Sequence, residues 1–211
     1  MRYVKKTSTP QFFIDNTIGI SRWEDYPVSK KPLKKHILQN EQNYLCIYCE
    51  SKVELSNSHL EHIKPKARDK FPELTFNYSN IVVSCNGNCH TTNEEYYSCG
   101  HIKDNEYDNL KFLNPVELID IRHYFKYNID TGNIIESSKD IEKAKYMIKT
   151  LHLNDGALPL ARKKALQIFI NKISKLDISQ RKNKIIELLN KENIAFVSFL
   201  KFKYKRILLN T

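Results

Sequence analysis

The residues best suited to chemistry gather between positions 46 and 105, a stretch that holds all five cysteines. The spacing Cys46-x-x-Cys49 is typical of a tight turn that aims two thiolates at one point. Zinc in a structural site takes four ligands in a tetrahedron, so two further ligands are needed. We predict that Cys85 and Cys99 supply them and that the four cysteines form one structural Zn²⁺ site.

The second half of this site has an alternative. Cys85-x-x-x-Cys89, with His90 next to it, can also provide the remaining ligands. Cys99 is favoured because the residues after it are predicted to form a helix that carries further ligands. The odd number of cysteines favours metal binding over disulfide bonds, as in a reducing compartment.

Between the cysteines lie residues that can activate water and hold a second metal ion. A neutral imidazole such as that of His62 can accept a proton from water near neutral pH. The adjacent Glu61 carboxylate suits a hard divalent ion. His101 and Asn105, four positions apart, would share one face of a helix and complete that metal site. Asn80 is predicted to fix the loop that carries the base, although capping a turn is its commoner use.

Three lysines close to these residues are candidates for binding phosphate. Lys64 and Lys66 directly follow the acid–histidine pair. Lys103 is predicted to lie on a different helical face from His101, where it would be free for phosphate.

Composition limits the class of protein. The chain has 211 residues, a hydrophobic content of 41% and a formal net charge of +10. No apolar run is long enough to predict a membrane span, and no signal peptide is visible, so we expect a cytoplasmic protein. Residues 141–211 hold 16 Lys and Arg against five Asp and Glu, which indicates a basic surface for a polyanion or an acidic protein partner.

The hydrophobic pattern predicts an α+β fold that is mostly helical. A helix is expected over Lys30–Asn43 and a short strand over Ser58–Ile63, with a loop over Phe71–Asn80. Residues 124–135 are typical of a β-hairpin, and helical spacing continues from residue 138 to the end. We expect three segments: an N-terminal segment (1–45), a central core (46–110), and a hairpin with a basic helical region (111–211).

Longer motifs around these residues carry a family resemblance. They are Leu45-Cys46-Ile47-Tyr48-Cys49-Glu50, His59-Leu60-Glu61-His62-Ile63-Lys64-Pro65-Lys66, Ser84-Cys85-Asn86-Gly87, Cys99-Gly100-His101 and Leu113-Asn114-Pro115. With them the chain resembles the HNH endonucleases of Septu-type and retron-associated antiphage defence systems, the PtuB-like proteins. The resemblance covers most of the chain. One departure is Asp104, which stands where glycine is usual after the lysine.

This resemblance implies a zinc-stapled ββα-metal (HNH) core that cleaves DNA. It implies His62 as the general base and the four cysteines as the structural zinc site. We also expect Asn80, Glu61 and His101 to belong to the catalytic set and Mg²⁺ or Mn²⁺ to be the nuclease ion. The resemblance further implies an ABC/SMC-like ATPase partner of the PtuA type, with or without a retron reverse transcriptase assembly.

Another class of function fits part of the same pattern. A zinc-stapled module could bind nucleic acid through its basic C-terminal region without catalysis of its own. That region could instead dock the ATPase.

Overall fold

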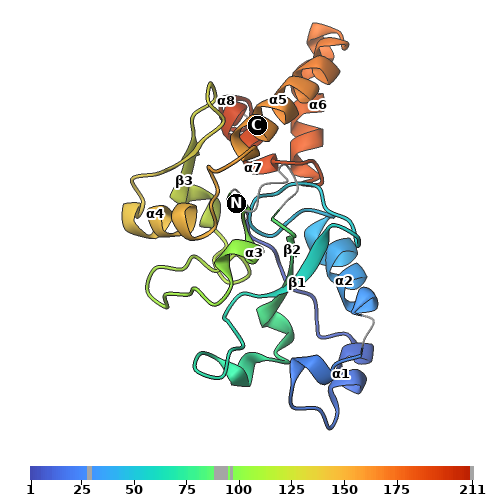
Figure 1. Ribbon diagram of the computed structural model, residues 1–211. Coiled ribbons are helices and arrows are strands. Elements are labelled where there is room, and N and C mark those ends of the chain that lie inside the picture. Colours follow the sequence, from blue (N-terminus) through green and yellow to red (C-terminus); the bar gives the residue numbers. More distant parts are fainter. Residues whose placement is uncertain (28–29, 88–94, 96, 210–211) are drawn as a thin grey trace.

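The strand expected over residues 58–63 is present in the computed structural model, which describes residues 1–27, 30–87, 95 and 97–209. β1 (Ser58–His62) pairs antiparallel with β2 (Ile81–Cys85), and Leu60 lies opposite Val83. Every residue of β2 is buried, which explains its continuous apolar run. The short helix α3 (Gly100–Lys103) packs against β2 and completes a ββα unit (Figure 1).

The helix expected over residues 30–43 has two parts. α2 (Lys31–Ile37) continues into a π-helical turn over Leu38–Gln42, which ends at Asn43 with a left-handed φ of 54°. The Gln42 side chain then bonds to both the N–H and the carbonyl of Val83, each at 2.8 Å. The π-helical turn thus supports β2 much as a neighbouring strand would.

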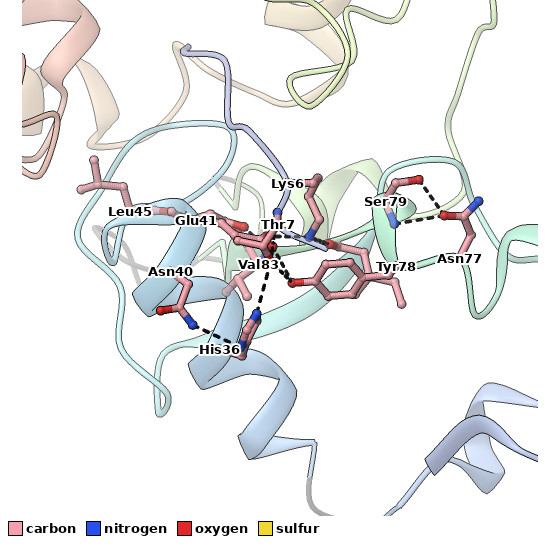
Figure 2. A network of polar contacts seen from close by, with 12 residues as sticks. Lys6, Thr7, His36, Asn40, Glu41, Leu45, Asn77, Tyr78, Ser79 and Val83 are labelled. Carbon is pink, nitrogen blue, oxygen red and sulfur yellow. Dashed lines mark hydrogen bonds and ion pairs between the residues drawn. The ribbon is translucent and has the colours of Figure 1, made fainter. Parts of the chain in front are cut away.

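A buried carboxylate ties the N-terminal segment to this π-helical turn (Figure 2). Glu41 accepts hydrogen bonds from Lys6 Nζ at 2.6 Å and from the Thr7 N–H and hydroxyl at 3.0 and 2.7 Å. The Tyr78 hydroxyl also donates to Glu41, and Lys6 Nζ donates to the Ile81 carbonyl at 2.8 Å. The network therefore joins the N-terminal segment, the π-helical turn and the start of β2.

From residue 125 onward the described chain is a β-hairpin followed by helices, as the sequence predicts. β3 and β4 pair antiparallel. Residues 115–117 and 119–120, which follow Asn114, form turns. The remaining α-helices and strands are α1 (Gln11–Thr17), β3 (Phe125–Tyr127), β4 (Ile134–Glu136), α4 (Ile141–Thr150), α5 (Leu158–Ser174), α6 (Ile178–Asn190), α7 (Val197–Lys203) and α8 (Lys205–Leu209). Short 3-10 helices occupy Trp23–Asp25, Pro72–Leu74, Tyr78–Asn80 and Ile121–Tyr124, so the expected loop over Phe71–Asn80 contains two of them.

The predicted fold class, α+β and mostly helical, is confirmed. One cluster of buried hydrophobic residues draws on all three expected segments, so the ββα unit shares its core with the N-terminal and C-terminal parts. α5 and α6 extend at one end of the molecule and α1 lies at the other (Figure 1). Across the described ranges, none of the helices combines the length and apolar character needed to cross a membrane.

Candidate functional site

The four cysteines predicted to bind metal meet at one buried point. Cys46 and Cys49 lie on the turn before β1, Cys85 ends β2, and Cys99 directly precedes α3. Their sulfur atoms all lie within 4.8 Å of one another. The alternative ligands Cys89 and His90 lie outside the described residues.

The arrangement of these sulfurs fits a tetrahedral zinc ion. A Zn–S bond of about 2.3 Å places tetrahedral sulfurs about 3.8 Å apart, and the Sγ atoms of Cys49 and Cys85 are 3.9 Å apart. Burial opposes ionisation of Cys46, yet hydrogen bonds with the other three thiols hold its pKa well below the usual value. Burial and the neighbouring thiols of Cys46 and Cys49 raise the pKa of Cys99. A bound cation would therefore allow all four groups to be thiolates together.

A cleft of about 500 Å³ opens between β1 and α3. Five residues singled out from the sequence line it, so segments that are far apart along the chain meet here. They are Glu61, His62, Lys66, His101 and Asn105.

His62 ends β1 and is 8% exposed. Its Nε2 lies 2.9 Å from the carbonyl oxygen of Thr75. A carbonyl only accepts hydrogen bonds, so Nε2 carries the proton and Nδ1 of the neutral ring keeps its lone pair. The Trp23 ring packs edge-on against the imidazole, with 4.6 Å between the ring centroids, and restricts its rotation. This geometry suits a base that accepts a proton at Nδ1.

Burial lowers the pKa of His62 to about 4, despite the opposing hydrogen bond to Thr75. We therefore expect its NMR titration midpoint near pH 4, measured on ¹³C-labelled histidine. At pH 5.5 an ordinary imidazole is about nine-tenths protonated, whereas His62 should remain neutral. Because the unfolded chain takes up this proton first, stability should fall as pH drops from about 6.5 toward 4. A midpoint above pH 6 would contradict the buried, neutral imidazole.

Asn80 clamps the loop that follows His62. Its Oδ1 accepts from the Lys64 N–H at 2.8 Å, and its Nδ2 donates to the Lys64 carbonyl at 2.9 Å. Its own carbonyl accepts from the Ile63 N–H at 3.0 Å. These contacts are the ones that a loop-fixing role requires, and that role stays a prediction.

Glu61 presents two different carboxylate oxygens. Oε1 accepts from the Tyr48 hydroxyl at 3.1 Å and lies 3.0 Å from Lys103 Nζ. Oε2 lies 3.7 Å from Nε2 of His59. The ion pair with Lys103 offsets the cost of burying the Glu61 charge, and it leaves Oε2 as the oxygen for a metal ion.

The expectation that Lys103 is free for phosphate is wrong. Its side chain is fully buried, and besides pairing with Glu61 it donates to the His62 carbonyl at 3.3 Å. Burial of the ammonium group is tolerated because a carboxylate and carbonyls surround it. Lys103 therefore positions both residues of the acid–histidine pair.

The expected helical relation between His101 and Asn105 is also wrong. α3 ends at Lys103, and Asp104 adopts φ 45° and ψ −119°, which no helix contains. His101 and Asn105 still line the same cleft, but one continuous helical face does not present them.

Glycine suits the backbone at position 104 better than aspartate does, because positive φ at a residue with Cβ is strained. We expect Asp104→Gly to raise the free energy of unfolding by about 1 kcal/mol. Urea denaturation followed by circular dichroism measures this change. Asp104→Ala is the matched variant and should give no such gain, because it keeps Cβ. Equal stabilisation by both variants would show that the side chain, not the backbone, is responsible.

The other two predicted phosphate ligands differ in location. Lys66 lines the cleft, with its Nζ 3.8 Å from Glu24 Oε1. Lys64 borders a separate hollow that also includes Tyr107. Lys66 is thus the better placed of the two to meet a phosphate beside His62.

Two residues of the site were missed from the sequence. Trp23 comes from the N-terminal segment, where no local pattern points to the cleft. His59 had a visible signal, because residues two apart on a strand face the same side and Glu61 is two positions later.

Comparisons with known proteins identify relatives. A family model described as HNH endonuclease matches residues 46–95. A Vibrio cholerae serotype O1 biovar El Tor protein, named as a candidate HNH endonuclease of retron Vc95, is 34% identical over 160 residues, which cover 72% of each chain. An Escherichia coli protein, named as a candidate HNH endonuclease of retron Ec83, is 28% identical over an alignment 214 positions long that covers 81% of each chain.

Proposed function

The chain belongs to the HNH endonuclease family, and we propose that it hydrolyses DNA phosphodiester bonds in the cleft between β1 and α3. The observation that carries this proposal is the state of His62. Its proton is fixed on Nε2 by Thr75, and its ring lines the same cleft as the Glu61 carboxylate.

His62 is the general base in this proposal. Nδ1 takes a proton from a water molecule as the water oxygen attacks phosphorus, the P–O3′ bond breaks, and the leaving O3′ takes up a proton from solvent. Asn80 keeps the His62 loop in place, and Lys66 offers positive charge to the phosphate. His62 can accept a proton at neutral pH because burial keeps its imidazole neutral there.

HNH nucleases depend on a metal ion, and the cleft contains suitable donors. Bound Mg²⁺ or Mn²⁺ would supply positive charge to polarise the scissile phosphate and to stabilise the leaving oxygen. Glu61 offers Oε2, and the predicted ligands His101 and Asn105 line the cleft. The buried cysteine cluster is a separate site whose soft thiolates suit zinc.

The experiment that tests this function uses supercoiled plasmid incubated with the purified chain and Mn²⁺, with and without EDTA. We expect nicking that EDTA abolishes. The result could instead be DNA binding without EDTA-sensitive cleavage, both for the chain alone and for its complex with the ATPase. That result would identify a zinc-stapled binding module.

We also infer that the nuclease is the effector subunit of an antiphage defence complex with an ABC/SMC-like ATPase. The resemblance to PtuB-like proteins supports this inference, as do the retron names of the two relatives. A retron reverse transcriptase assembly would be a further partner.

We propose that the basic C-terminal region binds either DNA or this ATPase, and charge reversal tests both roles. Lys203, Lys205 and Arg206 are exposed on α7 and α8. Reversing these three to Glu should lower DNA affinity by about 10-fold or more at low salt if they contact phosphates. The control reverses the exposed Lys31, Lys35 and Lys70, which lie outside this region.

Two measurements read out this charge reversal. Fluorescence anisotropy with labelled duplex DNA gives the affinity, and co-purification reports ATPase binding. Loss of the ATPase with unchanged DNA affinity would mean docking, and an effect equal to the control would exclude both roles.

A further inference from the structure

A second metal-binding side chain faces the Glu61 carboxylate from the same strand. His59 and Glu61 are two positions apart on β1, so their side chains project from one face. His59 Nε2 lies 3.7 Å from Glu61 Oε2, and both residues line the cleft. The His59 side chain is 33% exposed, which leaves it accessible to an entering ion.

The other ring nitrogen of His59 has a partner that sets the tautomer. Nδ1 lies 3.3 Å from Oδ1 of Asn86, the residue that follows β2. In the neutral ring, donation from Nδ1–H to this amide oxygen leaves Nε2 with its lone pair. Histidine ligands of metals commonly have such a partner, which orients the ring and fixes the tautomer.

Gly100 makes room for this pair. A Cβ at position 100 would lie 2.8 Å from Glu61 Oε2 and 2.9 Å from His59 Nε2. The start of α3 therefore packs directly on the two side chains and contributes none of its own. The Glu61 carboxylate and the His59 ring on β1 occupy the space that a side chain at position 100 would fill.

We propose that His59 Nε2 and Glu61 Oε2 jointly bind the nuclease metal ion, a proposal that rests on the function proposed above. Two donors about 2.1 Å from one ion can be at most about 4.2 Å apart, so a separation of 3.7 Å fits. Lys103 and Tyr48 hold Oε1, so Glu61 binds through one oxygen.

His101 lies apart from the His59–Glu61 pair in its packing. Its ring packs edge-on against Tyr97, with 5.1 Å between the centroids, and its side chain is exposed. Within the described ranges, the cysteine cluster is the one group of three or more His, Cys, Asp or Glu side chains placed to hold a metal ion together. His101 therefore does not close a three-donor group with His59 and Glu61, and water and phosphate oxygens complete the shell.

Mn²⁺ binding tests the proposal without reference to cleavage. The zinc-loaded full chain is titrated with Mn²⁺, the affinity is measured by electron paramagnetic resonance, and imidazole coordination is read from ¹⁴N modulation of the electron spin echo. Wild type, His59→Ala, His101→Ala and the control His123→Ala, an exposed histidine outside the cleft, are compared. Zinc content and circular dichroism report folding.

We expect His59→Ala to weaken Mn²⁺ binding by at least the roughly 10- to 100-fold that loss of an outer partner costs, and to remove the ¹⁴N modulation. His101→Ala should keep the ¹⁴N modulation, and His123→Ala should keep both the affinity and the modulation. If His59→Ala misfolds, the test rests on His101→Ala, in which the ¹⁴N modulation should persist.

Two results would overturn the assignment of His59. One is unchanged affinity and modulation in a folded His59→Ala variant, and the other is loss of modulation in His101→Ala. If the plasmid is still cut in an EDTA-sensitive manner, the proposed function survives either result. Wild type that neither binds Mn²⁺ nor cleaves would remove both proposals.

Discussion

Replacing His62 with alanine is expected to lower the rate of plasmid nicking by about 10²- to 10⁴-fold, the usual cost of removing a general base. The reason is local. Thr75 and Trp23 fix the ring, and its pKa of about 4 keeps it neutral at pH 7. Single-turnover cleavage with saturating Mn²⁺ measures the chemical step, and zinc content should stay unchanged.

Two variants serve as controls for His62→Ala. His123→Ala removes an exposed histidine outside the cleft and should cut at the wild-type rate. His62→Gln retains an amide that can donate to the Thr75 carbonyl but cannot serve as a base, so it should be as inactive as alanine. Normal nicking by either His62 variant would show that the base assignment is wrong.

Replacing Cys85 with serine is expected to remove zinc and unfold the ββα unit. Cys85 joins the end of β2 to the turn before β1 and to the start of α3 through the cluster. Structural zinc sites contribute about 10–16 kcal/mol in small domains, as much as the whole stability of a typical protein. Metal analysis should show no bound zinc, and thermal unfolding should lose its cooperative transition near the wild-type temperature.

The matched variant for this second experiment is Cys89→Ser, which changes the alternative ligand. If Cys99 completes the site, Cys89→Ser keeps one zinc per chain and the wild-type melting temperature. If Cys89→Ser loses zinc and Cys99→Ser retains it, Cys89 and not Cys99 is the fourth zinc ligand.

Much of this architecture could be read from local patterns. The thiolates needed only residue type and spacing, and the buried β2 needed only its apolar run. Glu61 and His62 were found because an acid, a histidine and two lysines adjoin one another in the sequence. Whether the acid and the histidine act in catalysis remains a prediction.

The errors arose where long-range contacts override local ones. Lys103 looked like a surface lysine, but a carboxylate 42 positions earlier in the sequence holds it inside. The expected helix carrying His101 ends early because Asp104 has positive φ, and periodicity does not report a single backbone angle. The packing of Trp23 on His62 depends on the tertiary fold, which no local pattern encodes.

The central claim is that two metal ions serve separate duties, one held by sulfur and one beside His62. Crystals grown with zinc and soaked in Mn²⁺ test this claim most directly, through anomalous difference maps at the two absorption edges. We predict a zinc peak bound by Cys46, Cys49, Cys85 and Cys99, and a manganese peak in the cleft at coordination distance from Glu61 Oε2. An empty cleft with the cysteine site filled, or manganese bound away from Glu61 and His62, would contradict the claim.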